Sequence, residues 1–216
     1  MTESGPSSPR FSLPPALAGC VCGIVFALCS WQVLVRGPLF RWDEDLGDAM
    51  RAAAPPRALA EVLADLGNMP VALPSLSAAM ALSLLLTRGR GWWPVLCYAV
   101  AMGVLAPVVT GVKLWTDRVG PLGGGGYFPS GHAATTAVAF GGALLLLSGL
   151  LSSAVRAVAW ALVASLTVGN GLGLVWRGYH WPLDVAASWC LGVLLLSWAA
   201  VAARRPPRRP RRRQAG

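Results

Sequence analysis

The chain has 216 residues, of which 55% are apolar and only 12% are charged, and its formal net charge is +9. Soluble domains carry about 25% charged residues. The composition therefore excludes a disordered chain, a small disulfide scaffold and, despite the charge, a soluble nucleic-acid-binding domain. The basic residues are almost all Arg: the sequence contains one Lys, Lys113, and two His, His132 and His180.

Six apolar runs of about twenty residues are each long enough to cross a bilayer as a helix. We predict spans at 16–35, 69–87, 93–114, 133–151, 154–175 and 183–203. These runs lack the regular polar face of a soluble helix. The sequence therefore predicts an all-α, polytopic membrane protein with a six-transmembrane-helix bundle over 16–203.

The distribution of basic residues predicts the orientation. An even number of spans places both termini on one side of the membrane. That side holds eleven basic residues: Arg10, Arg88, Arg90, Arg156 and the seven Arg between 204 and 213. The other side holds seven: Arg36, Arg41, Arg51, Arg57, Lys113, Arg118 and Arg177. By the positive-inside rule, segment 1–15 and the Arg-rich tail 204–216 are expected in the cytoplasm. The bundle between them is expected to lie in the plasma membrane.

The Arg-rich tail suggests two partners. Anionic lipid headgroups attract basic segments that follow a transmembrane helix. Nucleic acid is the alternative, but no aromatic residue interrupts the Arg run. We therefore expect membrane lipids as partners and no nucleic acid, while the oligomeric state stays open.

Several local patterns allow more than one interpretation. The stretch 17–20 resembles a lipoprotein cleavage box, but the apolar run continues past Cys20 and favours a helix. All five Cys lie in predicted spans without metal-ligand spacing, so we expect packing residues. Several Trp at predicted helix ends are typical of an interfacial belt; they are Trp92, Trp93, Trp115, Trp176 and Trp181.

The first outer loop, 36–68, is the longest. Its acidic run Asp43-Glu44-Asp45 could open a short surface helix that Pro55-Pro56 ends. Such a helix could cover the end of the bundle at the membrane interface, or it could take part in substrate access. The sequence leaves both roles open.

Three segments at the outer ends of the last four spans contain the only Lys and both His: 113–121, 123–132 and 176–184. Ser130 stands at the N-cap position of a span, where free backbone amides favour an anion. Lys113, Arg118 and Arg177 add positive charge suited to phosphate. Asp184 lies four residues after His180, so its carboxylate can orient that imidazole. This set of residues indicates phosphoryl transfer without a metal.

The run Pro129-Ser130-Gly131-His132 resembles the central signature of the type 2 phosphatidic acid phosphatase superfamily. Lys113 upstream and His180-x3-Asp184 downstream match its other two motifs. The resemblance implies that His180 attacks phosphorus and becomes a phosphohistidine, that Asp184 orients it, and that His132 acts as general acid and then base. It also implies phosphate binding by Lys113, Ser130 and the Gly131 amide, an extracytoplasmic active site, and no metal or cofactor.

Two motifs depart from the family pattern. Gly120 stands where the first motif has Arg, and Arg118 is the nearest replacement. The third motif has Gly-Leu at 173–174 where Ser-Arg is usual, and Arg177 is the nearest cation. We therefore expect Arg118 and Arg177 to complete the phosphate site.

The resemblance implies a metal-independent, integral-membrane lipid phosphatase. Phosphatidic acid, phosphatidylglycerol phosphate and polyprenyl diphosphates are all candidate substrates, because the motifs select phosphate and not the lipid tail. The alternative is a catalytically weak relative that binds or transports phospholipid headgroups, and the displaced Arg residues favour it.

Overall fold

The structure, a computed structural model, describes residues 14–206. Its helices are α1 (Pro15–Leu34), α2 (Pro38–Ala52), α3 (Arg57–Asp65), α4 (Met69–Leu86), α5 (Trp92–Thr116), α6 (Gly131–Leu147), α7 (Ser153–Trp176) and α8 (Pro182–Ala203), with a 3-10 turn at Ser148–Leu150 after α6. Arg10 and the tail beyond residue 206 lie outside the described residues. The predicted all-α class is confirmed.

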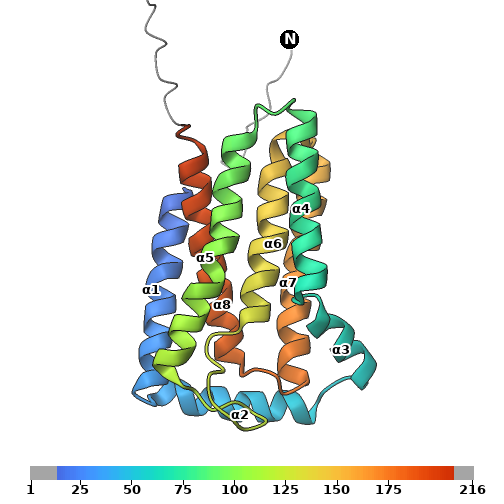
Figure 1. The fold of residues 1–216 in the computed structure, drawn as a ribbon. Helices are drawn as coiled ribbons and strands as arrows, with labels where there is room; N and C mark the ends of the chain where they lie inside the picture. Colours follow the sequence, from blue (N-terminus) through green and yellow to red (C-terminus); the bar gives the residue numbers. More distant parts are fainter. Residues whose placement is uncertain (1–13, 207–216) are drawn as a thin grey trace, which may run out of the picture.

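Six of the helices, all but α2 and α3, are long and apolar enough to cross a membrane. With the 3-10 turn counted as part of the α6 span, the shortest span is α4 with 18 residues, which is about 27 Å at 1.5 Å per residue. Each matches one predicted span, and the ends differ by at most four residues. The six run side by side in an up-and-down bundle (Figure 1). The chain is therefore a multi-pass membrane protein.

The loop 36–68 between the first two spans forms two helices instead of the single one expected. α2 begins at Pro38, five residues before the acidic run, because Pro fits the first turn of a helix. It lies across the end of the bundle, and α3 follows it at the same end (Figure 1). α3 begins directly after Pro56 and was not predicted. The connection between the first two spans is therefore a helical cap on one end of the bundle.

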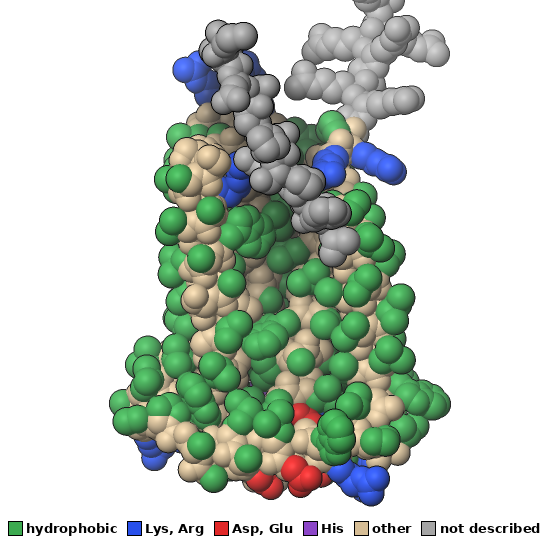
Figure 2. Space-filling view, turned by 180° about the vertical axis from the view of Figure 1, so that it is seen from behind, with side chains coloured by type: hydrophobic (Ala, Val, Ile, Leu, Met, Phe, Trp, Pro, Cys, Tyr) green, Lys and Arg blue, Asp and Glu red, His purple; other side chains and the backbone are tan. Residues whose placement is uncertain are grey.

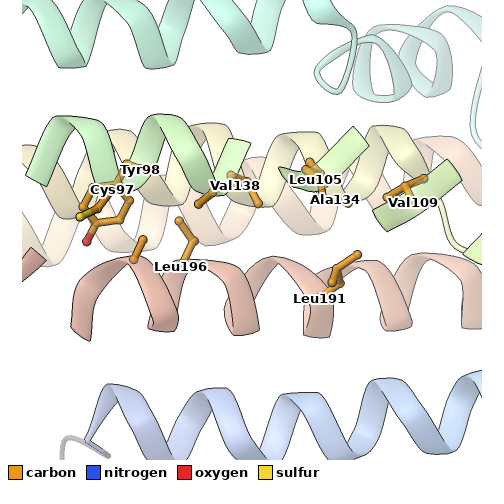
Figure 3. Packing of buried hydrophobic residues seen from close by; sticks show 10 residues of the cluster. Cys97, Tyr98, Leu105, Val109, Ala134, Val138, Leu191 and Leu196 are labelled. Atoms are coloured by element: carbon orange, nitrogen blue, oxygen red, sulfur yellow. The ribbon is translucent and has the colours of Figure 1, made fainter. Parts of the chain in front are cut away.

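The core of the bundle lies between α5, α6 and α8 (Figure 3). Tyr98 and Leu105 from α5, Val138 from α6 and Leu191 from α8 belong to one buried cluster. Glycines let the helices approach closely, as is usual between membrane helices. A Cβ at Gly19 of α1, for example, would lie 2.9 Å from Cβ of Ser197 on α8. Gly19 is part of the stretch that resembles a lipoprotein cleavage box. In the structure it lies within α1 and packs against α8.

Charged residues gather at the two ends of the bundle, while apolar side chains cover the flank that Figure 2 shows. All described Asp and Glu fall on α2, on α3 or at the ends of α5 and α8 beside them. The opposite end, where α1 begins and α8 ends (Figure 1), carries Arg88, Arg90, Arg156, Arg204 and Arg205. The polar chemistry of the protein therefore lies at the end capped by α2 and α3.

Candidate active site

A cavity of about 390 Å³ opens between α4, α5 and α6 at the capped end of the bundle. Its polar end is formed by Lys113, Gly131, His132 and His180. The rest of its wall is mostly apolar and includes Met69, Met102, Leu105, Ala106 and Val109. Residues from all three sequence motifs therefore meet at one end of an otherwise apolar cavity.

The central motif forms the start of α6. Ser130 is the N-cap residue, and its Oγ accepts a hydrogen bond from the amide of Ala133 at 3.3 Å. The backbone N–H of Ser130 donates to the carbonyl of Asp184 at 3.2 Å, which ties α6 to α8. Ser130 is fully buried, so its hydroxyl holds the helix start instead of facing the cavity. Gly131 does line the cavity, and the first amides of a helix have no partner within it.

The two histidines differ in exposure. His180 is only 6% exposed and lies just before α8, and its Nδ1 faces Oδ2 of Asp184 at 3.2 Å. Because an ionised carboxylate can only accept, this contact places the proton on Nδ1 and leaves the lone pair on Nε2. His132, in the first turn of α6, is exposed and lines the same cavity. One imidazole is therefore fixed in a single tautomer, while the other is accessible.

Lys113 supplies the positive charge of the cavity. Its Nζ donates to the carbonyl of Gly126 at 2.6 Å, which anchors the side chain to the glycine-rich loop. An ammonium group has three N–H donors, so two stay available for a ligand. Among residues 14–206, Lys113 is the only Lys or Arg that lines this cavity.

Arg118 does not line this cavity, contrary to its expected role as a phosphate ligand. Its Nη1 donates to Oδ1 of Asp184 at 2.6 Å, and its Nη2 donates to Oδ2 of Asp43 at 2.5 Å. The residue is 2% exposed. Its terminal nitrogens are thus occupied by two carboxylates, one of which is the partner of His180.

Arg177 is also bound elsewhere. Its Nε donates to a carboxylate oxygen of Glu61 on α3, and the hydroxyl of Tyr179 donates to the other oxygen at 2.8 Å. These contacts hold the pKa of the Glu61 carboxyl below its usual range and raise the pKa of Arg177. Arg177 therefore fixes α3 to the end of α7, and it does not line the cavity.

The two departures from the family pattern have structural causes. A Cβ on Gly120 would lie 2.2 Å from the ring of Tyr127, so that ring fills the place of a side chain. A Cβ on Gly173 would lie 2.5 Å from the backbone nitrogen of Ala64, so α3 packs directly on α7 there. Leu174 is buried in an apolar cluster with Ala64. The usual cation positions are therefore filled by an aromatic ring and by apolar packing.

A second cavity of about 380 Å³ lies on the α3 side of the same two histidines. Glu61, Asp65, Asn68 and Tyr127 line it together with Leu174 and Tyr179. The edge of the Tyr127 ring faces His180, with ring centroids 5.7 Å apart. The histidine pair therefore separates an apolar cavity from a more polar one.

Sequence reasoning missed Asp43, Tyr127 and Asn170. Fully buried Asn170 donates to the carbonyls of Leu63 and Ala64 at 3.1 and 2.8 Å, and accepts from Thr136. A polar residue inside an apolar span is a functional or structural signal by itself, so this one could have been found. No pattern near Asp43 or Tyr127 indicates its partner.

Several other residues of this end of the bundle and of the spans have clear places in the structure. Asp117 caps α5 in a left-handed conformation (φ 40°), and its N–H donates to the carbonyl of Lys113. Trp181 is buried against the Arg118 guanidinium, so it is not a lipid-facing belt residue. Within residues 14–206, no group of three His, Cys, Asp or Glu could hold a metal ion. The five cysteines are all free.

Comparison with known proteins agrees with the motifs. Residues 109–207 match the model of the PAP2 superfamily, and these residues contain nearly all of the polar cavity wall. The fold is similar to the crystal structure of a transmembrane PAP2-type phosphatidylglycerolphosphate phosphatase from Bacillus subtilis, with a TM-score of 0.72 and 21% identity over 87% of this chain and 94% of that one. The search of curated proteins found no match. Residues 109–207 are therefore similar to the PAP2 superfamily, and the fold is similar to that of a transmembrane PAP2-type protein.

Proposed function

We propose that the protein is an integral-membrane lipid phosphatase that removes a phosphate monoester or diphosphate from a lipid without a metal ion. The observation that carries this proposal is the two-part cavity. Its polar end holds Lys113, Gly131 and both histidines, and the remainder of its wall is apolar. A phosphate and the first part of a hydrocarbon tail of one molecule match these two regions.

In the first step, Nε2 of His180 attacks phosphorus. The bond from phosphorus to the lipid oxygen breaks, and His132 donates a proton to that leaving oxygen. Asp184 accepts from Nδ1 of His180 and stabilises the positive charge that develops on the ring. Lys113 and the free amides at the start of α6 bind the phosphate oxygens, where negative charge increases in the transition state.

In the second step, His132 is neutral and acts as a general base on a water molecule. The water oxygen attacks the phosphohistidine, the bond from Nε2 to phosphorus breaks, and inorganic phosphate leaves. His180 returns to its neutral tautomer. The more polar cavity on the α3 side gives water a path to both histidines that does not cross the apolar cavity.

We infer that the active site faces outward and that both termini are cytoplasmic. Eleven of the eighteen basic residues fall on the side of the termini and seven on the side of the site. Of these seven, Arg51, Arg118 and Arg177 are bound to carboxylates. The excess of Lys and Arg on the side of the termini supports this orientation.

The substrate is a lipid phosphate on the outer leaflet. Phosphatidic acid, phosphatidylglycerol phosphate and polyprenyl diphosphates all fit a phosphate site with an apolar extension. The name of the Bacillus subtilis protein makes phosphatidylglycerol phosphate the first compound to test.

The test is phosphate release by the purified chain in detergent, with a panel of these lipids and with EDTA present. We expect release by the wild type and loss in His180→Ala and His132→Ala, each checked for an unchanged thermal transition. Equal release by wild type and His180→Ala would contradict the proposed mechanism.

A headgroup-binding protein with weak catalysis is the second candidate, because Lys113 is the only Lys or Arg in the wall of the cavity. It predicts saturable binding of the same lipids without phosphate release. Equilibrium binding measured beside turnover separates the two functions.

A further inference from the structure

Three charged side chains form a buried row behind His180. Asp184 contacts His180, Arg118 contacts Asp184 at 2.6 Å, and Asp43 contacts Arg118 at 2.5 Å. The three side chains are at most 5% exposed. Asp43 comes from α2, the helix that lies across the end of the bundle (Figure 1). The row therefore connects the α2 cap to the proposed nucleophile.

Each carboxylate oxygen in this row has its own partner. Oδ1 of Asp184 accepts from Arg118, while Oδ2 accepts from the Trp181 amide at 3.1 Å and faces His180. In Asp43, Oδ2 accepts from Arg118 and Oδ1 accepts from the Leu183 amide at 2.6 Å. Rotation of the Asp43 carboxylate would break two contacts at once, and rotation of the Asp184 carboxylate would break three. The position of Nδ1 of His180 is therefore fixed through Asp184.

Arg118 is itself held in place. The Phe40 ring lies 4.8 Å and the Trp181 ring 5.7 Å from its guanidinium carbon. Planar stacking and two separate carboxylates suit a guanidinium and not an ammonium group. Its guanidinium also places a positive charge directly beside Oδ1 of Asp184. An ionised Asp184 is the form that accepts the Nδ1–H of His180.

We propose that Arg118 and Asp43 are positioning residues for His180: they hold the Asp184 carboxylate correctly turned, and they do not bind the phosphate. This inference rests on the proposed function only in giving His180 the role of nucleophile. It assigns α2 a part in the reaction, because Asp43 belongs to that helix. It also separates Arg118 from the role that its place in the first motif suggests.

Two variants test the inference. Asp43→Asn keeps an oxygen that can accept from the Leu183 amide but loses the charge that faces Arg118. Arg118→Lys keeps the charge but cannot contact both carboxylates in the same planar arrangement. Asp45→Asn is the matched control, since it removes an exposed carboxylate from the same helix.

The first readout is the split between kcat and KM for the lipid that the wild type hydrolyses. Loss of a positioning residue lowers kcat by about 10- to 100-fold, as the loss of supporting residues around an active site does. It leaves KM and inhibition by inorganic phosphate within about threefold of wild type. Loss of a phosphate ligand has the reverse effect: it raises KM and weakens inhibition by inorganic phosphate more than it lowers kcat. Asp45→Asn is expected to change neither constant.

The second readout needs no substrate. The chain has only two histidines, so labelling with ¹⁵N-histidine gives four ring nitrogen signals for the folded protein in detergent. We expect wild type and Asp45→Asn to show His180 protonated at Nδ1 alone, and Asp43→Asn and Arg118→Lys to show a mixture of tautomers. His132 is expected to give the same signals in all four proteins.

The two readouts separate the two proposals. If the wild type releases no phosphate from any lipid, the proposed function fails, and the nitrogen spectra still decide the positioning inference. Unchanged His180 signals in both folded variants would overturn the inference, whatever their activity. Asp43→Asn is the milder change, so it keeps the test valid if Arg118→Lys does not fold.

Discussion

Removal of Lys113 is predicted to weaken phosphate binding strongly, because this cavity has no other Lys or Arg. Its Nζ uses one of three donors on the Gly126 carbonyl and has two for the phosphate. A hydrogen bond to a charged group contributes about 1.5–3 kcal/mol, and about 1.4 kcal/mol corresponds to a factor of ten. Lys113→Met is therefore expected to lower kcat/KM by about 10- to 150-fold, with no neighbouring cation to compensate.

The assay is hydrolysis of the preferred lipid in detergent, with inorganic phosphate as a competing ligand. Lys113→Arg keeps the charge and is expected to retain most phosphate binding. Arg177→Met is the matched control, because it also removes one cation near the site, but from a residue bound to Glu61. We expect Arg177→Met to change kcat/KM by less than about threefold. Equal losses in Lys113→Met and Arg177→Met would refute the assignment of Lys113 as the principal phosphate cation.

Three further predictions follow from individual contacts. Leu174→Arg places the family's usual Arg at the wall of the more polar cavity. This variant should tighten inhibition by inorganic phosphate about tenfold or more. A folded variant with unchanged inhibition would mean that this side of the histidines does not bind phosphate. Gly173→Ala should lower the free energy of unfolding by about 1–3 kcal/mol, because the new Cβ would meet the backbone of α3. Gly103→Ala is the control, because its new Cβ meets nothing within 4 Å. Thermal unfolding in detergent compares the two variants, and equal melting temperatures would disprove close α3–α7 packing. Burial raises the pKa of Asp43 to about 6, so this residue is charged above pH 6 and is neutral, like Asn, below it. The ratio of wild-type kcat to Asp43→Asn kcat should therefore fall toward one as the pH drops through 6. A ratio that stays constant from pH 5 to 8 would contradict the role of its charge.

The sequence predicts the bundle and the candidate site residues because each depends on a local pattern. A membrane helix needs about twenty apolar residues in a row, and the six spans follow directly from that requirement. The His180-x3-Asp184 contact spans only four residues at the start of α8, and the structure has it. The number of spans also predicts that the three motif segments lie together at one end of the bundle.

The sequence does not predict the fate of the two displaced arginines, because it depends on contacts between distant segments. Arg118 pairs with Asp43, 75 positions earlier, and Arg177 pairs with Glu61, 116 positions earlier. α3, which brings Glu61 to Arg177, is a nine-residue helix without a side-chain cap. Its position follows from close packing on Gly173, which no local pattern reveals.

The proposed mechanism requires a covalent bond between Nε2 of His180 and phosphorus. The most direct measurement is rapid acid-free denaturation of the protein during turnover of a ³²P-labelled lipid phosphate, followed by measurement of label on the chain. The account predicts label that is stable in base, is released by acid, and is absent from His180→Ala. Label that survives acid, or label of the same amount on His180→Ala, would contradict it.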